Sequence, residues 1–237
     1  MHTVRAGSGP RLVLIHGSAA DHATWAAQLA SPVLRERVEL VAYDRRADAA
    51  TVEDHAADAA ALAPDFVVGS SFGAVIALEL ARTRELRGAV LIEPPMRAAD
   101  APDPAQAAFL GEFDRELAAR GGAAAGELFL RTAIGDTAFE RMPPALRERA
   151  VGRWREIRGD SAALVAYAPR YAELPRLTTP VLLVGGERSS SYFRPTLHAL
   201  AAALPHARLE IIAGGHMLHA ESARRFNELV ADFTDHC

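Results

Sequence analysis

The chain has 237 residues, of which half are hydrophobic, and its net charge of -4 comes from both signs well mixed. This length and composition predict one folded domain with room for an inserted subdomain, and they argue against a disordered chain. The mixed charge gives no reason to expect nucleic acid or an anionic membrane surface as a partner. Cys237 is the only cysteine, so no disulfide can form within the chain.

The first residues lack the charged and apolar regions of a signal peptide. No apolar stretch approaches the ~20 residues that are needed to span a bilayer. We therefore expect a cytoplasmic protein that does not associate with membranes. The sequence gives no indication of the oligomeric state.

Short apolar runs alternate with helical patterns along most of the chain. Six runs show little polar alternation, as is typical of parallel strands covered on both faces: 11–15, 38–43, 66–68, 89–92, 181–184 and 209–212. Helices are predicted between these runs, over residues 51–62, 74–80, 195–204 and 221–233. The alternation predicts an α/β fold in which a mostly parallel central sheet carries helices on both faces.

This alternation stops between residues 95 and 175. The segment contains helical patterns separated by proline and glycine, and no convincing strand: 107–120, 126–133, 144–157 and 162–171. We interpret it as a helical cap inserted between two strands of the sheet. The predicted organisation is therefore a core formed by residues 1–94 and 176–237, and a cap formed by residues 95–175.

A G-x-S-x-G pentapeptide, Gly69 to Gly73, lies between the apolar run 66–68 and the helical pattern that follows it. A serine on such a tight strand-to-helix turn holds its hydroxyl out of the sheet, in a strained backbone that needs small neighbours on both sides. The N-terminus of the following helix favours negative charge that develops beside the serine. Ser71 is therefore the candidate nucleophile.

The order of strand, pentapeptide, helix, helical insertion and a final Gly214-Gly215-His216 resembles the α/β-hydrolase fold, and the resemblance covers essentially the whole chain. In that family the nucleophile, the acid and the histidine follow one another in this order. The resemblance implies that Ser71 is the nucleophile and that His216 is the base. His219 is a close rival in sequence, although the two glycines before His216 favour the latter.

An upstream His16-Gly17-Ser18, after the first long apolar run, resembles the HG motif of the same family. In that motif a backbone N–H helps to bind the oxyanion that forms during acyl transfer. The resemblance therefore implies an oxyanion hole formed by the backbone N–H groups of Ser18 and Phe72.

The position of the carboxylate that would pair with His216 departs from the usual family pattern. The family usually supplies it in a Gly-x-x-Asp sequence after the strand at 181–184, and this chain has Ser189 in the place of the aspartate. Some members take the acid instead from the end of the strand that follows the nucleophile, where this chain has Glu93. Glu93 is therefore the leading candidate for the acid, and Glu187 is the alternative.

A serine hydroxyl needs a base to remove its proton, and a carboxylate on the far imidazole nitrogen fixes the tautomer of that base. The site predicts a serine hydrolase that cleaves an ester, lactone or thioester of a small, mainly apolar molecule through an acyl-enzyme. Two alternatives stay open, because fold does not fix reaction. One is a lyase, cyclase or transferase that uses the same serine and histidine, and the other is a non-catalytic protein that binds a small molecule. The sequence has no H-E-x-x-H, cysteine cluster or P-loop, so we expect neither a metal nor a cofactor.

Overall fold

A computed structural model describes the whole chain, residues 1–237. It contains a seven-stranded sheet with the strand order β1-β3-β2-β4-β5-β6-β7. The strands are β1 (Thr3–Ala6), β2 (Arg11–Ile15), β3 (Glu39–Tyr43), β4 (Phe66–Ser70), β5 (Gly88–Ile92), β6 (Val181–Gly186) and β7 (Ala207–Ile212). All neighbouring strands are parallel except β1, which pairs antiparallel with β3. The predicted mostly parallel sheet is therefore confirmed. Strand β1 was not predicted, because none of its side chains is buried and no apolar run marks it.

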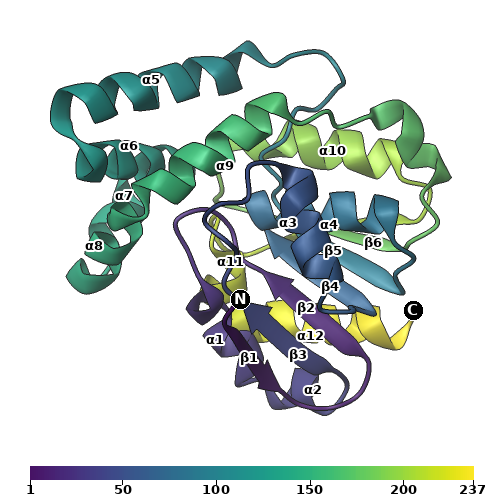
Figure 1. Cartoon of the computed structure of the whole chain (residues 1–237). Helices are drawn as coiled ribbons and strands as arrows, with labels where there is room; N and C mark the ends of the chain where they lie inside the picture. The colour runs from purple at the N-terminus through teal and green to yellow at the C-terminus, as the bar shows by residue number, and fades with distance from the viewer.

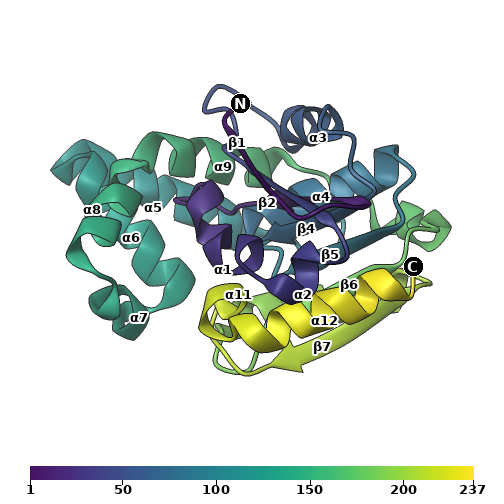
Figure 2. The same cartoon turned by 90° about the horizontal axis from the view of Figure 1, so that it is seen from below.

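Helices cover both faces of this sheet, as Figures 1 and 2 show. The helices outside the insertion are α1 (Ala26–Leu29), α2 (Pro32–Arg35), α3 (Val52–Ala60), α4 (Phe72–Thr83), α10 (Arg194–Ala203), α11 (Leu218–Glu221) and α12 (Ala223–Asp235). Short 3-10 helices are η1 (His22–Trp25), η2 (Tyr171–Arg176) and η3 (Ser191–Phe193). Helices α3, α4 and α10 pack on one face, and α1, α2 and α12 pack on the other.

Each face of the sheet has its own apolar core. Along β2, Val13 and Ile15 pack toward α3 and α4, whereas Leu12 and Leu14 pack toward α2 and α12. All four side chains are buried. Burying such a side chain stabilises a fold by about 1.5–3 kcal/mol. A strand that is covered on both faces has no polar alternation, and this is why the central strands were recognisable as continuous apolar runs.

Five helices lie between β5 and β6 without an intervening strand. They are α5 (Pro104–Arg120), α6 (Gly122–Ile134), α7 (Asp136–Arg141), α8 (Pro144–Gly152) and α9 (Trp154–Ala166). Helices α5 to α8 extend beyond one edge of the sheet, and α9 runs back toward it (Figure 1). The division of the chain into a core and a cap remains a prediction.

The helix boundaries within the insertion differ from those predicted. The expected helix over 144–157 is interrupted at Arg153, whose ψ of 21° is not helical, so that α9 begins at Trp154. Helix α9 then ends at Ala166, because Tyr167 is extended, with a ψ of 132°. The nearby Pro169 explains why the expected helix does not continue to 171, since a proline disfavours a helical residue before it.

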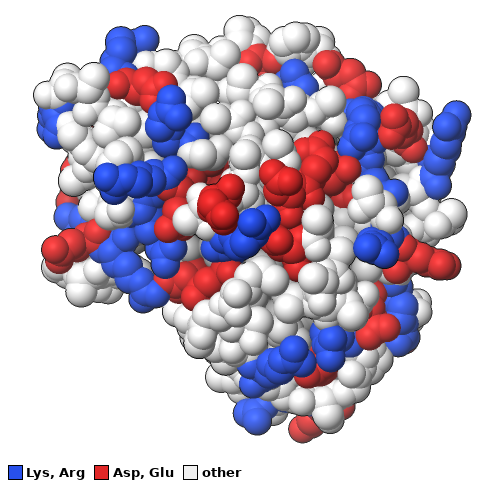
Figure 3. All heavy atoms as spheres, in the orientation of Figure 1, with Lys and Arg blue, Asp and Glu red and all other residues white.

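None of the helices combines the length and the apolar character that crossing a membrane requires. Acidic and basic side chains are interspersed on the face shown in Figure 3. Many charged side chains of the molecule form ion pairs, such as that of Arg158 on α9 with Asp114 on α5, at 2.7 Å. Exposed pairs of this kind contribute only ~0–1 kcal/mol to stability.

Candidate active site

Ser71 lies at the sharp turn between β4 and α4. Its backbone angles, φ 55° and ψ -123°, are rare for any residue other than glycine. The turn needs both flanking glycines: a Cβ on Gly69 would lie 2.1 Å from the carbonyl oxygen of Gly73, and a Cβ on Gly73 would lie 2.2 Å from that of Ile15. The N–H of Ser71 donates to the carbonyl of Ile92 at 2.8 Å. The neighbouring strands β2 and β5 therefore fix this strained turn from both sides.

The side chains of Glu93 and His216 are hydrogen-bonded to each other, although they are 123 positions apart in the chain. His216 Nδ1 lies 2.6 Å from Glu93 Oε2, and both side chains are buried. Glu93 directly follows β5, and His216 lies in the loop between β7 and α11. The structure thus brings the predicted acid and the predicted base together. Because the carboxylate can only accept, Nδ1 carries the proton and Nε2 is left with a free lone pair.

The Glu93 carboxylate accepts two further hydrogen bonds. The Gly186 N–H donates to Oε1 at 2.8 Å, and the Ser189 hydroxyl donates to Oε2 at 2.6 Å. Ser189 stands where the family usually carries its acid, and here it holds the acid that comes from β5. Glu93 itself has a φ of 44°, which is uncommon for a residue other than glycine. Three donors therefore fix a carboxylate that lies on a strained backbone, and the sequence alone did not reveal the part that Ser189 takes.

The two rival residues lie elsewhere. The Glu187 side chain is exposed and makes no hydrogen bond or ion pair within the chain. The ring of His219 is buried against Trp25 and Phe226, with ring centroids 4.7 and 6.4 Å away. Burial lowers the pKa of His219 to about 3, so this histidine is neutral. Its surroundings are those of a packing residue.

The loop that carries His216 is ordered by several contacts. The ring of Phe193 stacks on the imidazole, with centroids 4.3 Å apart and planes 6° apart. The Gly215 N–H donates to the carboxylate of Glu221 at 2.9 Å. Gly214 has a φ of 139°, a conformation that side chains rarely adopt. The glycine pair before His216 therefore has a physical role, because it allows the turn that aims the imidazole.

A cavity of about 280 Å³ lies against Ser71. It is lined by Ser18, Ser71, Pro95, Ala105, Gln106, Phe109, Phe129, Thr132, Ala133, Ser161, Leu164, Ser190, Tyr192 and Phe193. Helices α5, α6 and α9 of the insertion supply eight of these 14 residues. None of the lining side chains is charged. A charged group inside the cavity would therefore lose its water without gaining a counter-ion, so the cavity favours an uncharged molecule.

The two N–H groups predicted for the oxyanion hole belong to residues that lie close to Ser71. Phe72 is the first residue of α4, so its N–H has no acceptor within the helix. Ser18 lines the same cavity as Ser71. The preceding residue is a glycine because space is short there: a Cβ on Gly17 would lie 3.0 Å from the Cβ of Ser71. The loop after β2 therefore lies directly beside the turn that carries Ser71.

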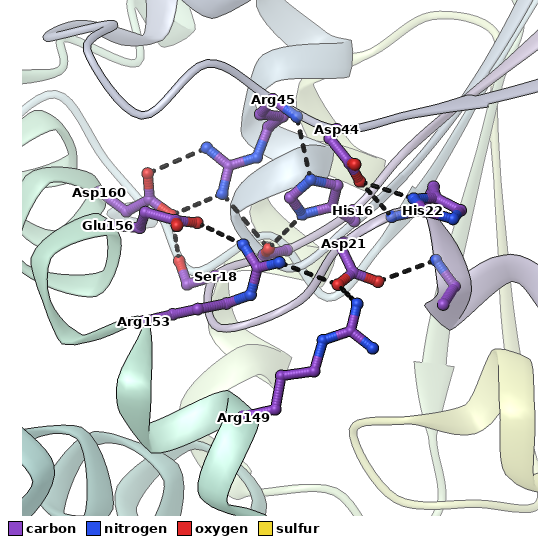
Figure 4. Close-up of polar contacts among 12 residues, drawn as sticks. His16, Ser18, Asp21, His22, Asp44, Arg45, Arg149, Arg153, Glu156 and Asp160 are labelled. Atoms are coloured by element: carbon purple, nitrogen blue, oxygen red, sulfur yellow. Dashed lines mark hydrogen bonds and ion pairs between the residues drawn. The ribbon is translucent and has the colours of Figure 1, made fainter. Parts of the chain in front are cut away.

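Figure 4 shows a polar cluster behind this loop that the sequence analysis did not identify. Asp160 on α9 binds the guanidinium of Arg45 through both oxygens, at 3.0 and 2.7 Å. The Ser18 hydroxyl donates to the same carboxylate at 2.7 Å. Arg45 and Asp160 are 115 positions apart and come from different layers of the fold. No local pattern in the sequence could have paired them.

A second group of polar side chains lies outside the cavity. The potential ligand atoms of His2, His22 and Asp44 lie within 4.8 Å of one another. His22 Nδ1 is already bonded to Asp44 Oδ1 at 2.8 Å. None of the three residues lines the cavity, and we assign them no part in its chemistry.

The chain matches the model of the alpha/beta hydrolase family over residues 12–229. It is 29% identical to the pimeloyl-(acyl-carrier protein) methyl ester esterase of Xanthomonas oryzae pv. oryzae over 229 residues, which cover 91% of this chain and 90% of that protein. It is 30% identical to the protein of the same name from Stenotrophomonas maltophilia strain R551-3 over 233 residues, which cover 91% of this chain and 89% of the relative.

Solved structures share the fold at lower identity. An enol-lactonase from Burkholderia xenovorans superposes with a TM-score of 0.80 at 21% identity, covering 98% of this chain and 95% of that one. A thermophilic esterase from Thermogutta terrifontis superposes with a TM-score of 0.82 at 20% identity, covering 98% of this chain and 92% of that one. Together with the family match, these findings agree with the fold described above. The chain therefore belongs to the alpha/beta hydrolase family and is an ester-cleaving hydrolase.

Proposed function

We propose that the protein is a serine esterase in which Ser71, His216 and Glu93 form the catalytic triad. The observation that carries the proposal is the buried Glu93–His216 hydrogen bond of 2.6 Å beside a cavity that Ser71 lines. This bond leaves His216 Nε2 as a proton acceptor. The imidazole stacks on Phe193, which lines the same cavity as Ser71, the serine with a positive φ. A base of this kind is what an alkyl hydroxyl needs to become a nucleophile at neutral pH.

The reaction proceeds in two balanced halves. Ser71 Oγ attacks the ester carbonyl carbon while His216 Nε2 takes its proton, and the carbonyl oxygen becomes an oxyanion that accepts hydrogen bonds from the N–H groups of Ser18 and Phe72. The tetrahedral intermediate collapses, the carbon–oxygen bond to the alcohol breaks, and His216 gives its proton to the departing oxygen. Water then attacks the acyl-enzyme in the same way and releases the acid.

The cavity suggests the class of substrate. Its volume of about 280 Å³ lies at the small end of the range for small-molecule sites, and its lining lacks charged side chains. We therefore propose small esters whose acyl part is uncharged and mainly apolar. The curated relatives are named for a methyl ester of pimeloyl-(acyl-carrier protein). A methyl ester at the end of an uncharged acyl chain fits the same description, and we include this class among the test substrates.

Two alternative functions are less well supported. A lyase, cyclase or transferase for an anionic intermediate would need a counter-ion in the cavity, and no lining residue supplies one. A non-catalytic binding protein would be favoured if no carboxylate met the histidine. Ser189 stands at the usual acid position, but the Glu93 carboxylate is hydrogen-bonded to His216. The esterase is the proposal that uses all of these contacts.

The experiment compares wild type and Ser71→Ala on p-nitrophenyl esters with acyl chains of two to twelve carbons. We expect wild type to prefer short and medium chains, and Ser71→Ala to lose at least ~10³-fold in kcat, in line with the loss of a triad nucleophile. Equal rates for the two proteins would contradict the role of Ser71.

A matched pair of substrates tests the uncharged cavity. The dimethyl and monomethyl esters of one dicarboxylic acid have the same chain length but differ by one negative charge at neutral pH. We expect the dimethyl ester to have the higher kcat/KM. Equal or faster cleavage of the charged monoester would contradict the proposed substrate class while leaving the esterase chemistry intact.

A further inference from the structure

The peptide group between Gly17 and Ser18 is held from the side opposite its N–H. The Gly17 carbonyl accepts hydrogen bonds from His16 Nδ1 at 2.8 Å and from Arg45 at 3.3 Å. A peptide bond is planar and trans, so the carbonyl and the N–H of one peptide group point in opposite directions. Fixing the Gly17 carbonyl therefore also fixes the direction of the Ser18 N–H, which is one of the two proposed oxyanion donors.

Arg45 is the centre of this arrangement (Figure 4). Besides the Gly17 carbonyl, its guanidinium binds both oxygens of Asp160, and its backbone N–H donates to His16 Nε2 at 3.2 Å. The guanidinium carbon also lies 4.9 Å from the ring centre of Phe72, whose N–H is the other proposed oxyanion donor. One buried side chain thus contacts both segments that would bind the oxyanion.

The two histidines of the cluster are neutral and support this arginine. Burial, together with the positive charge of Arg45, holds the pKa of His16 well below its usual value. Its Nδ1 therefore donates to the Gly17 carbonyl and its Nε2 accepts from the Arg45 N–H. Burial and the charge of Arg45 also lower the pKa of His55 to about 4, and His55 Nε2 lies 3.2 Å from the guanidinium as an acceptor.

The inserted helices hold the same loop at two points. Asp160 on α9 accepts from the Ser18 hydroxyl at 2.7 Å. Farther along the loop, Asp21 Oδ2 accepts from Arg149 on α8 and from Arg153, at 2.8 Å for Arg153. Asp21 Oδ1 accepts from the backbone N–H of Ala23 at 3.0 Å. The position of the insertion and the position of the oxyanion loop are therefore linked by charged side chains, of which Arg149 is exposed and the others are buried or half-buried.

We propose that Arg45 and Asp160 are positioning residues that hold the Gly17–Ser18 peptide with its N–H toward the oxyanion, and that they link the inserted helices to catalysis. This inference rests on the proposed esterase function. An uncharged side chain could pack α9 against the core equally well, whereas a bidentate charged pair also fixes the orientation of the guanidinium that binds the Gly17 carbonyl. The pair touches the oxyanion loop through the Gly17 carbonyl and the Ser18 hydroxyl, but it does not line the cavity, so its effect passes through the loop.

A positioning role of this kind has a specific kinetic signature. An oxyanion donor acts in the transition state, so its misplacement lowers kcat and leaves KM nearly unchanged. Removing an oxyanion donor outright typically costs ~10²–10³-fold in kcat, and misdirecting one by loss of its support should cost ~10- to 100-fold. A pair that only anchored α9 to the core would instead lower thermal stability and leave kcat per folded enzyme unchanged.

The experiment measures kcat and KM of Asp160→Asn with a p-nitrophenyl ester, per active site titrated with a fluorophosphonate. A short alkyl trifluoromethyl ketone serves as a second readout, because addition of Ser71 creates an oxyanion in the same hole. We expect kcat to fall ~10- to 100-fold, KM to change less than ~3-fold, and ketone affinity to fall by the same factor as kcat. Asp114→Asn is the matched control, since it removes the same charge from an exposed ion pair of the insertion.

Ser18→Ala removes only one contact to Asp160 and keeps the backbone N–H, so it tests the same link if Asp160→Asn does not fold. We expect ~3- to 10-fold lower kcat and ketone affinity, as for the loss of one hydrogen bond. Normal kcat and ketone affinity in both variants, or a loss confined to KM, would overturn the inference while wild type stays active. A wild type without Ser71-dependent esterase activity would overturn the proposed function and the inference with it.

Discussion

Replacing Glu93 by glutamine changes one atom of a buried carboxylate whose two oxygens both accept hydrogen bonds. The Gly186 N–H donates to one oxygen, and His216 Nδ1 and the Ser189 hydroxyl donate to the other. A glutamine amide has only one oxygen. If that oxygen faces His216, the amide NH₂ meets the Gly186 N–H, and two buried donors are left opposed at a cost of ~1–3 kcal/mol each.

The opposite orientation of the amide leaves no group unpaired. The glutamine oxygen then accepts from Gly186, and the hydroxyl of Ser189 can rotate to accept from the NH₂. His216 Nδ1 must also accept, so the proton moves to Nε2, which can no longer act as the base. Because this orientation avoids the opposed donors, we expect it to prevail. Where the carboxylate partner of a triad histidine is neutralised in this way, kcat falls by ~10⁴, so we predict a loss of ~10³–10⁴-fold here.

The assay is kcat on a p-nitrophenyl ester, with thermal unfolding as the check that Glu93→Gln folds. Glu187→Gln is the matched control, because the Glu187 carboxylate is exposed and makes no hydrogen bond or ion pair within the chain, and it should keep wild-type activity. A near-normal Glu93→Gln beside a crippled Glu187→Gln would refute the assignment of the acid. Near-normal activity of both variants would mean that Ser71 and His216 work without an acid.

Two further predictions concern stability. In the folded protein His219 stays neutral until the pH approaches about 3. In the unfolded chain a histidine binds a proton below about pH 6.5. The free energy of unfolding should therefore fall by up to ~1.4 kcal/mol per pH unit as the pH drops below 6.5. Urea unfolding of His219→Gln should show a shallower pH dependence than wild type, and unchanged behaviour would contradict the burial argument; exposed His198→Gln is the control. Gly73→Ala should lower the thermal midpoint sharply, because its Cβ would lie 2.2 Å from a carbonyl oxygen. Gly159→Ala is the contrasting variant: its Cβ would lie in open space within α9, so the change should raise the free energy of unfolding by ~0.5–1 kcal/mol. A Gly73→Ala variant as stable as wild type would show that the turn can relax.

The central sheet could be predicted from the sequence because its physical cause is local. Each central strand is covered on both faces, so every residue of stretches such as 12–15 or 181–184 is apolar, and the pattern identifies the strand without tertiary information. Strand β1 was not predicted because none of its residues is fully buried at this edge of the sheet, so no apolar run marks it. The break between α8 and α9 was not predicted because a single non-helical ψ at Arg153 has no clear sequence signal.

Only those parts of the candidate site that lie within one short sequence motif could be predicted from the sequence. The pentapeptide around Ser71 and the glycine pair before His216 are local, since the turns they form demand small residues. Glu93 could be proposed from its place after β5, but the donors that hold it come from β6, the loop after β6 and the loop after β7, between 93 and 123 positions away. The Arg45–Asp160 pair joins the loop after β3 to α9 and has no local signature, so only the folded chain reveals it.

The most direct measurement of the central claim is mass spectrometry of the protein after treatment with a fluorophosphonate at neutral pH. An acyl-enzyme mechanism with a single activated serine predicts one adduct per chain, on the peptide that contains Ser71, with loss of esterase activity in proportion to labelling. Labelling should slow strongly in His216→Ala, because the base that activates the hydroxyl is gone. An adduct on Ser70 or Ser191, or full esterase activity after complete labelling of Ser71, would contradict the account.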